Sequence, residues 1–317
     1  MQTGVAVILF NRPDLTEQVF RAVAAARPRR LFLIADGPRP DHAEDSARCA
    51  RARAVVEQVD WECDVRRNYS DVNLGCGLRP ATGISWVFEH VDAAIILEDD
   101  CVPHPTFFPY CEELLERFRD DPRVMLIAGH NPYTFAPSVS RAHSYRFSRM
   151  VDTWGWATWA RAWMHHDMGV ERWPERRRQM LLQEVSDHPC FLAELTAALD
   201  AASAKNGNVD YWDYQWAFAL WAQAGLAVAP TVNLVSNRGF RDDATHTRDP
   251  DDRYANSTVS PMECPLRHPP FTVCDVEADR YAMEQHYART RPTTHRRLRN
   301  FARKARALYD AARSGSC

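Results

Sequence analysis

Strand and helix patterns alternate along the first 130 residues, and this alternation constrains the fold more than any other feature of the sequence. Each short apolar run ends in turn or polar residues, and a stretch with apolar residues at helical spacing follows it. The strand patterns cover 4–10, 30–37, 62–66, 93–97 and 124–129, and the helical patterns cover 14–26, 43–59 and 82–91. Because strands and helices that take turns form a parallel sheet with helices on both faces, the sequence predicts an α/β fold.

The alternation stops after residue 130. A segment rich in loops and tryptophan follows, and then come helical patterns over 156–163, 175–205 and 211–224 and a strand near 227–237. We expect three parts: a first half over 1–130, a second half of the same domain over 131–290, and a basic tail over 291–317.

Composition narrows the class of protein. A chain of 317 residues can bury a large core, and a net charge of -3 gives no reason to expect nucleic acid as a partner. No apolar run approaches the roughly 18 residues that span a bilayer, and no signal-peptide pattern precedes the first strand. We therefore expect a cytoplasmic protein. The nine cysteines form no CxxC pair, so neither a disulfide framework nor a zinc site is indicated.

Three acidic residues, Glu98, Asp99 and Asp100, directly follow the apolar strand at 93–97. Neighbouring carboxylates repel one another, so a positive group is expected beside them. One of them could cap the helix that begins near Pro105, but capping would explain only one acid. A hard divalent cation, which prefers oxygen ligands and bridges carboxylates to phosphates, would explain all three at an exposed edge of the sheet.

Polar residues also follow two other strands. Asn11 and Arg12 come after the first strand and Asp36 comes after the second. An arginine suits a phosphate, and an aspartate suits a base N–H or a ribose hydroxyl. Taken singly, Arg12 could form a surface ion pair and Asp36 could be a turn residue. Together with the acids, these residues predict a pocket for a nucleoside diphosphate.

The stretch NLGCGLRPATG at 73–83 resembles a dinucleotide-binding loop only superficially, because Pro80 stands where a third glycine is required. We interpret it as a loop. Its Arg79 could reach a diphosphate, or the segment could be a plain connection.

The order of NRPDLT, ADGP, NLGCGLR and the EDD block resembles the GT-A glycosyltransferases. Among them it is most similar to bacterial relatives of the inverting Golgi enzyme that adds N-acetylglucosamine to the trimmed high-mannose N-glycan. The resemblance continues through SRMVDTWGWATWARAW, VDYWDYQW and NLVSNRGFRDDATHT, and so covers residues 4–247. It implies a GT-A fold, a nucleotide-sugar-binding first half and an acceptor-binding second half.

The resemblance also implies roles for single residues. Asp100 would bind Mn²⁺ or Mg²⁺, Asp99 would contact the ribose or the metal, and Glu98 would contact the donor sugar. Arg12 would hold the diphosphate and Asp36 the base. His246 would help to complete the metal and diphosphate site, although by its spacing alone it could be a surface loop residue.

A transferase of this kind needs a base that removes the proton from the acceptor hydroxyl. The resemblance points first to Asp152, just before TWGW, and second to Asp213 in DYWDYQW. Asp210 and Asp213 also have the spacing of a helix-capping pair, so Asp213 could instead be a cap. Trp156, Trp159 and Trp163 fall on one face of the helix expected at 156–163 and are predicted to be core, which leaves Trp154 to stack on a sugar.

The sequence thus predicts a metal-dependent, inverting glycosyltransferase that acts on a glycan or a lipid-linked acceptor in surface polysaccharide synthesis. The alternatives are a sugar-1-phosphate nucleotidyltransferase and an inactive protein that binds sugar nucleotides or serves as a scaffold. A nucleotidyltransferase usually opens with a glycine-rich loop, and VILFNRPDL lacks one.

The tail over 291–317 is strongly basic, and it places Leu298, Phe301, Ala305 and Leu308 at helical spacing. It could be a solvated helix. Alternatively, its apolar stripe and arginines could attach the protein to the anionic inner face of a membrane, where a lipid-linked acceptor would be found.

Overall fold

A computed structural model describes residues 1–133, 142–204, 209–245 and 248–288. His246 and the tail from 291 therefore lie outside the described residues. Within the described residues, no helix has the length and hydrophobicity needed to cross a membrane.

The centre of the fold is an eight-stranded sheet with the order β3-β2-β1-β4-β8-β6-β9-β7. A two-stranded sheet pairs β10 with β5. The strands are β1 (Gly4–Leu9), β2 (Arg30–Ala35), β3 (Asp64–Tyr69), β4 (Ala93–Glu98), β5 (Cys101–Pro103), β6 (Val124–Ala128), β7 (Tyr145–Ser148), β8 (Trp156–Trp159), β9 (Leu226–Pro230) and β10 (Val235–Asn237).

Six strands of the large sheet run in one direction, and only β8 and β7 run against their neighbours. Strand β8 comes from the second half of the chain but lies between β4 and β6 of the first half. Because β8 is antiparallel to both, it begins at the edge where β4 and β6 end: Trp156 pairs with Ile96 and with Ala128. The loop before β8 thus reaches the carboxyl edge of the parallel strands.

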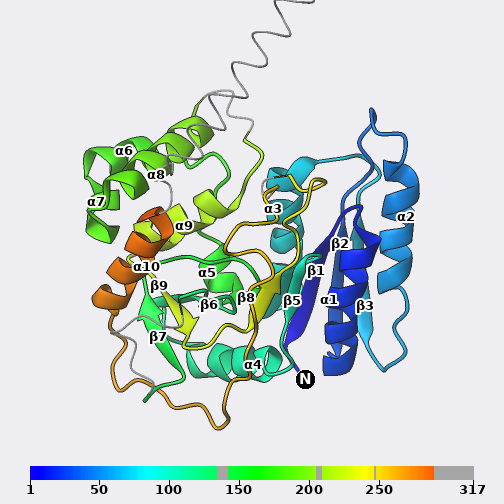
Figure 1. The fold of residues 1–317 in the computed structure, drawn as a ribbon, viewed down its shortest axis with the longest axis horizontal. Coiled ribbons are helices and arrows are strands. Elements are labelled where there is room, and N and C mark those ends of the chain that lie inside the picture. Colours follow the sequence, from blue (N-terminus) through cyan, green and yellow to red (C-terminus); the bar gives the residue numbers. More distant parts are fainter. Residues whose placement is uncertain (134–141, 205–208, 246–247, 289–317) are drawn as a thin grey trace, which may run out of the picture.

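Helices cover both faces of the sheet, so the predicted α/β architecture with a mostly parallel sheet is confirmed (Figure 1). One core packs the sheet against α1, α2 and α4, and the other packs it against α3, α5, α8 and α9. The helices are α1 (Pro13–Ala26), α2 (Asp45–Val56), α3 (Gly75–Phe88), α4 (Phe107–Arg117), α5 (Ala160–Trp163), α6 (Trp173–Arg178), α7 (Leu181–Val185), α8 (Pro189–Ala202), α9 (Asp213–Ala222) and α10 (Val276–Ala288).

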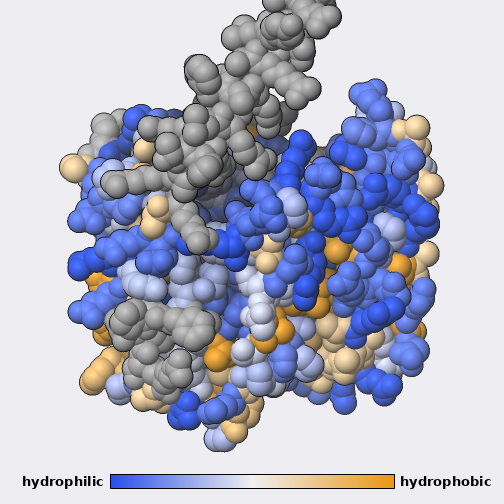
Figure 2. Space-filling view, in the orientation of Figure 1, coloured by the Kyte–Doolittle hydropathy of each residue, from blue (hydrophilic) through white to orange (hydrophobic). Residues whose placement is uncertain are grey.

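The beginning of the chain and much of its second half lie on opposite sides of the molecule. Figure 1 shows α1 and α2 with β1, β2 and β3 on the right, and α6, α7 and α8 with β7 and β9 on the left. Figure 2 shows that the face in this view is largely hydrophilic, with hydrophobic residues in scattered patches. Apolar side chains are instead concentrated in the two cores between the helices and the sheet.

The helix predicted over 156–163 is wrong in its first half. Residues Trp156–Trp159 form β8, and only Ala160–Trp163 form a helix, α5. Residues three apart in a strand point to opposite faces, so Trp156 packs into one core and Trp159 into the other. Both are buried as predicted, but the pairing with β4 and β6 outweighs the helical spacing.

Two further predictions are corrected. The single helix expected over 175–205 is three helices, α6, α7 and α8; Met180 between α6 and α7 has a left-handed backbone, and Pro189 begins α8. The loop expected over 73–83 is helical from Gly75 onward, with Pro80 inside α3.

Gly83 lets α3 lie close to the sheet, because a Cβ atom there would overlap the fully buried side chain of Ile34 on β2. Gly83→Ala should therefore destabilise the protein by about 1–3 kcal/mol, although alanine normally favours a helix. Urea unfolding would measure this change. Thr82→Ala, at the exposed neighbour, should stay within about 0.5 kcal/mol of the unmodified protein; equal stability of the two variants would contradict the close packing.

Candidate functional site

The parallel strands bring the predicted polar residues to one edge of the sheet. Strands β1, β2 and β4 are adjacent, and their last residues lie in register, Ile8 opposite Glu98 and Leu9 opposite Ala35. The residues that follow these strands therefore lie side by side, as the sequence predicted.

Arg12 is the positive group that pairs with the acid triplet. Its guanidinium donates to Asp99, and its Nη1 lies 2.9 Å from Asp100 Oδ2. Asp99 also accepts the backbone N–H of Phe10 at 3.3 Å. The three side chains of this ion-pair cluster are only 15%, 3% and 10% exposed, so the alternative of a surface ion pair for Arg12 is wrong.

The triplet is not at an exposed edge, which corrects the sequence-based expectation. Asp99 and Asp100 are buried, and Gly239 packs so closely on Asp100 that a side chain there would overlap its carboxylate. Burial, and then the charges of Asp100 and Asp99, raise the pKa of Glu98 to about 8. The three acids therefore do not carry three full charges at neutral pH.

Beside the triplet is a cavity of about 310 Å³, which we call the acid cavity. Arg12 is the basic side chain among the described residues of its lining, whereas Glu98, Asp100 and Asp213 are acidic. Its remaining wall comes from Cys76, Thr153, Trp154, Tyr211, Trp212, Tyr214, Asn237, Ala244 and Thr245. An anion that enters this cavity meets more negative than positive side chains.

Four of the predicted nucleotide-binding residues do not line the acid cavity: Asn11, Asp36, Arg79 and Asp99, the last of which is bound by Arg12. Asn11 is buried and donates to Asp45 at 2.7 Å. Arg79 is also buried, in α3, and its guanidinium donates to the side chain of Asn68 at 2.9 Å and to its backbone carbonyl.

Asp36 holds the start of α3. Its carboxylate accepts the backbone N–H groups of Gly37 at 2.9 Å, Leu74 at 2.9 Å and Gly75 at 3.0 Å, and the side-chain amide of Asn73 at 3.0 Å. A carboxylate at a helix N-terminus satisfies N–H groups that have no partner in the helix. This contact explains why the helix begins at Gly75, ahead of the predicted start.

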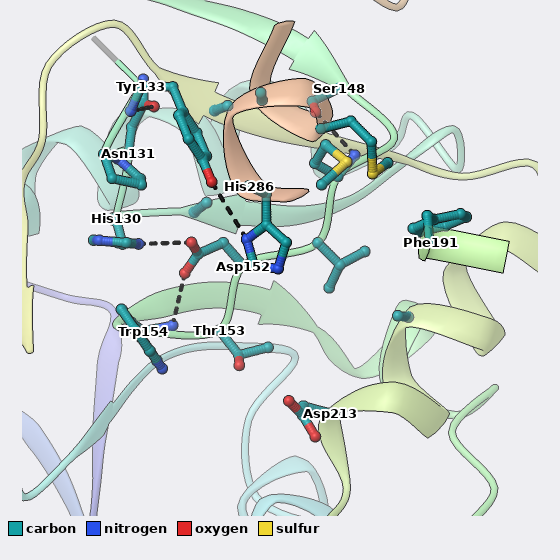
Figure 3. Close-up of a pocket in the computed structure, with 18 of the residues that line it drawn as sticks. His130, Asn131, Tyr133, Ser148, Asp152, Thr153, Trp154, Phe191, Asp213 and His286 are labelled. Carbon is teal, nitrogen blue, oxygen red and sulfur yellow. Dashed lines mark hydrogen bonds and ion pairs between the residues drawn. The ribbon is translucent and has the colours of Figure 1, made fainter. Parts of the chain in front are cut away.

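A second cavity, of about 380 Å³, adjoins the first, and we call it the aromatic cavity. Thr153, Trp154, Asp213 and Tyr214 line both, so they form a shared wall. Asp152 lines only the aromatic cavity. Figure 3 shows Asp152 between His130 and Trp154, with Asp213 across Thr153 from it.

Asp152 is held by two hydrogen bonds. Its Oδ2 lies 2.6 Å from Nδ1 of His130, and its Oδ1 accepts the backbone N–H of Trp154 at 3.0 Å. Because a carboxylate can only accept, the His130 Nδ1 carries the proton. The His130 side chain is 1% exposed and its Nε2 has no hydrogen-bond partner, so the ring is fixed by Asp152 and by packing on Trp154 at 4.7 Å.

His130 was not among the predicted site residues, although the sequence contains the signal for it. His130 stands two residues after β6, at the same edge of the sheet as Arg12 and Glu98. The rule that selected the polar residues after the first, second and fourth strands would have selected it as well.

A second polar group borders the aromatic cavity. Tyr254 Oη lies 2.8 Å from His286 Nδ1, and Arg253 donates to Tyr133 Oη at 3.0 Å and also to Tyr254. Burial lowers the pKa of His286, so the neutral ring is favoured. The four side chains connect the loop after β6, the segment between β10 and α10, and α10 itself.

The remaining predicted site residues are Asp213 and Trp154. Helix α9 begins at Asp213 and its N-cap residue is Trp212, so Asp210 does not stand at the N-cap position that a capping pair with Asp213 requires. Asp210 instead accepts the backbone N–H of Gly77 at 3.1 Å. Trp154 lines both cavities, and its ring packs against His130, Phe240 and Tyr254. Whether it stacks on a sugar stays a prediction.

The described residues hold no group of three His, Cys, Asp or Glu side chains that converge as metal ligands. The predicted metal ligands are Asp100 and His246, of which only Asp100 is described. Its Oδ2 is paired with Arg12, and its Oδ1 accepts the thiol of Cys101 at 3.4 Å.

No protein-family model matches the chain, and no curated protein matches it. Among solved structures, the galactosyltransferase LgtC in complex with donor and acceptor sugar analogues is 13% identical, with a TM-score of 0.35 over 77% of this chain and 91% of that one. UDP-glucose pyrophosphorylase complexed with UDP-glucose is 8% identical, with a TM-score of 0.34 over 73% and 90%. The 4-diphosphocytidyl-2C-methyl-D-erythritol synthase of Anaerococcus prevotii is 8% identical, with a TM-score of 0.31 over 52% and 74%.

The contacts of Asp36 predict a mainly structural effect of its removal. Asp36→Ala removes the acceptor of the Leu74 and Gly75 backbone N–H groups, and one of two acceptors of the Gly37 N–H and of the Asn73 amide, so it should destabilise the protein by about 2 kcal/mol or more. Urea unfolding would measure the loss. Asp71→Ala, at an exposed position in the loop between β3 and α3, is the matched control and should change stability by less than about 0.5 kcal/mol. An Asp36→Ala variant as stable as this control would contradict the capping role.

Proposed function

We propose that this protein is a metal-dependent glycosyltransferase of the GT-A type, which moves a sugar from a nucleoside diphosphate to a hydroxyl group of a glycan or lipid-linked acceptor with inversion. The observation that carries the proposal is the pair of adjoining cavities. One is lined by Arg12 and carboxylates, the other by the held carboxylate of Asp152, and they share a wall that contains Trp154 and Asp213.

The acid cavity is suited to the diphosphate of the donor if a cation accompanies it. Arg12 is already paired with Asp99 and Asp100, so it cannot by itself balance a diphosphate. The carboxylates of the triplet are hard oxygen donors, and Mg²⁺ characteristically uses one or two carboxylates together with phosphate oxygens and water instead of a complete protein cage. The residues present therefore fit Mg²⁺ or Mn²⁺, with Asp100 as the protein ligand.

When bound, such a cation would stabilise the negative charge of the leaving diphosphate. Arg12 would hold the diphosphate oxygens in place from the end of β1. Glu98, which lines the cavity, would contact the sugar. Four more predicted residues would support the acid cavity through their hydrogen bonds to neighbouring protein groups: Asn11, Asp36, Arg79 and Asp99.

Asp152 would act as the base. The acceptor oxygen attacks the anomeric carbon, the bond from this carbon to the diphosphate oxygen breaks with its electron pair on the oxygen, and the acceptor proton passes to Asp152. His130 keeps the carboxylate oriented, and Trp154 at the shared wall would pack against a sugar. A second cavity with its own base next to the first favours transfer to a separate acceptor over nucleotidyl transfer.

The proposal extends to surface polysaccharide synthesis, with the basic tail attaching the protein to an anionic inner membrane face. This part is supported by the charge and spacing of the tail sequence alone.

The metal dependence can be tested by binding. A thermal-shift screen of nucleotide sugars, with and without Mn²⁺, should find a donor that raises the melting temperature only with the metal. Asp100→Asn keeps the size of the side chain but removes its charge, so it should weaken metal-dependent nucleoside diphosphate binding by about tenfold or more in calorimetry. Equal affinity of the variant and the unmodified protein, with metal present, would refute the role of Asp100.

The base can be tested by turnover. Asp152→Asn keeps the shape but cannot take up the proton, so release of nucleoside diphosphate in the presence of acceptor should fall by roughly 10²-fold or more, while donor binding changes little. Asp213→Asn is the comparison, because Asp213 also lines the aromatic cavity. If Asp213→Asn were inactive and Asp152→Asn active, the assignment of the base would be reversed.

A further inference from the structure

The aromatic cavity has two chemically different ends. Figure 3 shows His130 and Trp154 on one side of it, Asp152 near the middle and Phe191 on the far side. Apolar side chains from four segments of the chain line the cavity, and Phe191 is among them: Met150, Val151, Phe191, Leu195, Ala217, Trp221, Ala282 and Met283. Phe191 and Trp221 pack edge to face there, with ring centroids 5.6 Å apart.

The polar side chains around this end bind one another. Glu194 accepts the hydroxyl of Tyr214 at 2.8 Å and the hydroxyl of Tyr287 at 2.9 Å. Arg146 donates to Asp279 at 2.6 Å. Glu194, Arg146, Tyr214 and Tyr287 line the cavity, and these bonds direct them to protein partners, whereas the buried Nε of Arg146 has no hydrogen-bond partner.

The same holds for two further groups. The indole N–H of Trp221 donates to the backbone carbonyl of Arg149 at 2.8 Å, and Ser148 Oγ donates to Asp279 at 2.5 Å. A sugar placed at this end would have to bury hydroxyl groups against apolar side chains and against polar side chains that already bind other parts of the protein. Burial of a hydroxyl without a partner is unfavourable, whereas burial of an apolar group there is favourable.

We propose that the acceptor is a hydroxyl compound with an apolar body, whose hydroxyl lies at Asp152 and whose apolar part fills the end of the aromatic cavity at Phe191. This inference rests on the proposed function, because it places the acceptor hydroxyl at the proposed base. It narrows the acceptor to a molecule with an alkyl or aryl group close to the reacting hydroxyl, and it excludes a free oligosaccharide.

The test compares three probes by calorimetry with the full chain: phenyl β-D-glucoside, methyl β-D-glucoside and 3-phenyl-1-propanol. Phenyl glucoside differs from methyl glucoside only in the aglycone, and phenylpropanol carries a hydroxyl and a ring without a sugar. We expect one or both ring-bearing probes to bind at least about tenfold more tightly than methyl glucoside, because a buried aromatic ring removes a large apolar area from water.

Two nearly isosteric variants make the apolar end polar without changing its volume. Met150→Gln and Val151→Thr lie on a half-buried segment, so neither removes a core residue. Each should weaken binding of the ring-bearing probes by about threefold or more. Met164→Gln repeats the first change at a position that is 74% exposed and outside the cavity, and it should bind the probes as the unmodified protein does.

The proposal is overturned if neither ring-bearing probe binds more tightly than methyl glucoside, or if both site variants bind the rings unchanged. Binding of UDP and GDP with Mn²⁺ to the unmodified protein separates this result from the proposed function. Loss of ring binding with diphosphate binding intact refutes the apolar acceptor alone. Ring binding without any nucleoside diphosphate binding retains the apolar site and refutes the transferase.

Discussion

The ion pairs between Arg12 and the two aspartates are the interaction on which the rest of the site depends. They join the end of β1 to the end of β4 at a position that is nearly closed to solvent. Unpaired, two buried aspartates and a buried arginine would each cost several kcal/mol, so each of the three stabilises the others at the carboxyl edge of the sheet. The close approach of Gly239 then brings the segment after β10 onto the same cluster.

The reversed strand β8 converts this edge into a two-sided site. A strand that runs against its neighbours begins where they end, so the loop before it arrives beside the loops that follow β4 and β6. Asp152 and Trp154 reach the carboxyl edge in this way, and His130 reaches it from β6. The wall shared by the two cavities is therefore a direct consequence of the sheet topology, and it separates a charged cavity from a largely apolar one.

Prediction from the sequence worked best where local pattern and tertiary packing agree. Five apolar runs in the first half became strands at nearly the predicted positions, and the residues after three of them converge. It failed where one pattern fits two structures. The spacing of Trp156, Trp159 and Trp163 fits one face of a helix. The first two instead belong to strand β8, because that segment pairs with both β4 and β6. The glycines before Pro80 indicated a loop, yet the contacts of Asp36 start a helix there.

The sequence by itself determined the α/β alternation and the position of the acid triplet, because these follow from the spacing of apolar and charged residues along the chain. Asp152 became the candidate base only through the family resemblance. Only the tertiary structure decided which groups pair with these charges. Arg12 pairs with the acid triplet, Asp36 binds the start of a helix, and His130 orients Asp152. These contacts, and the apolar end of the second cavity, all depend on residues far apart in sequence. Pairing of this kind is set by the order and direction of strands, and no local pattern carries that information.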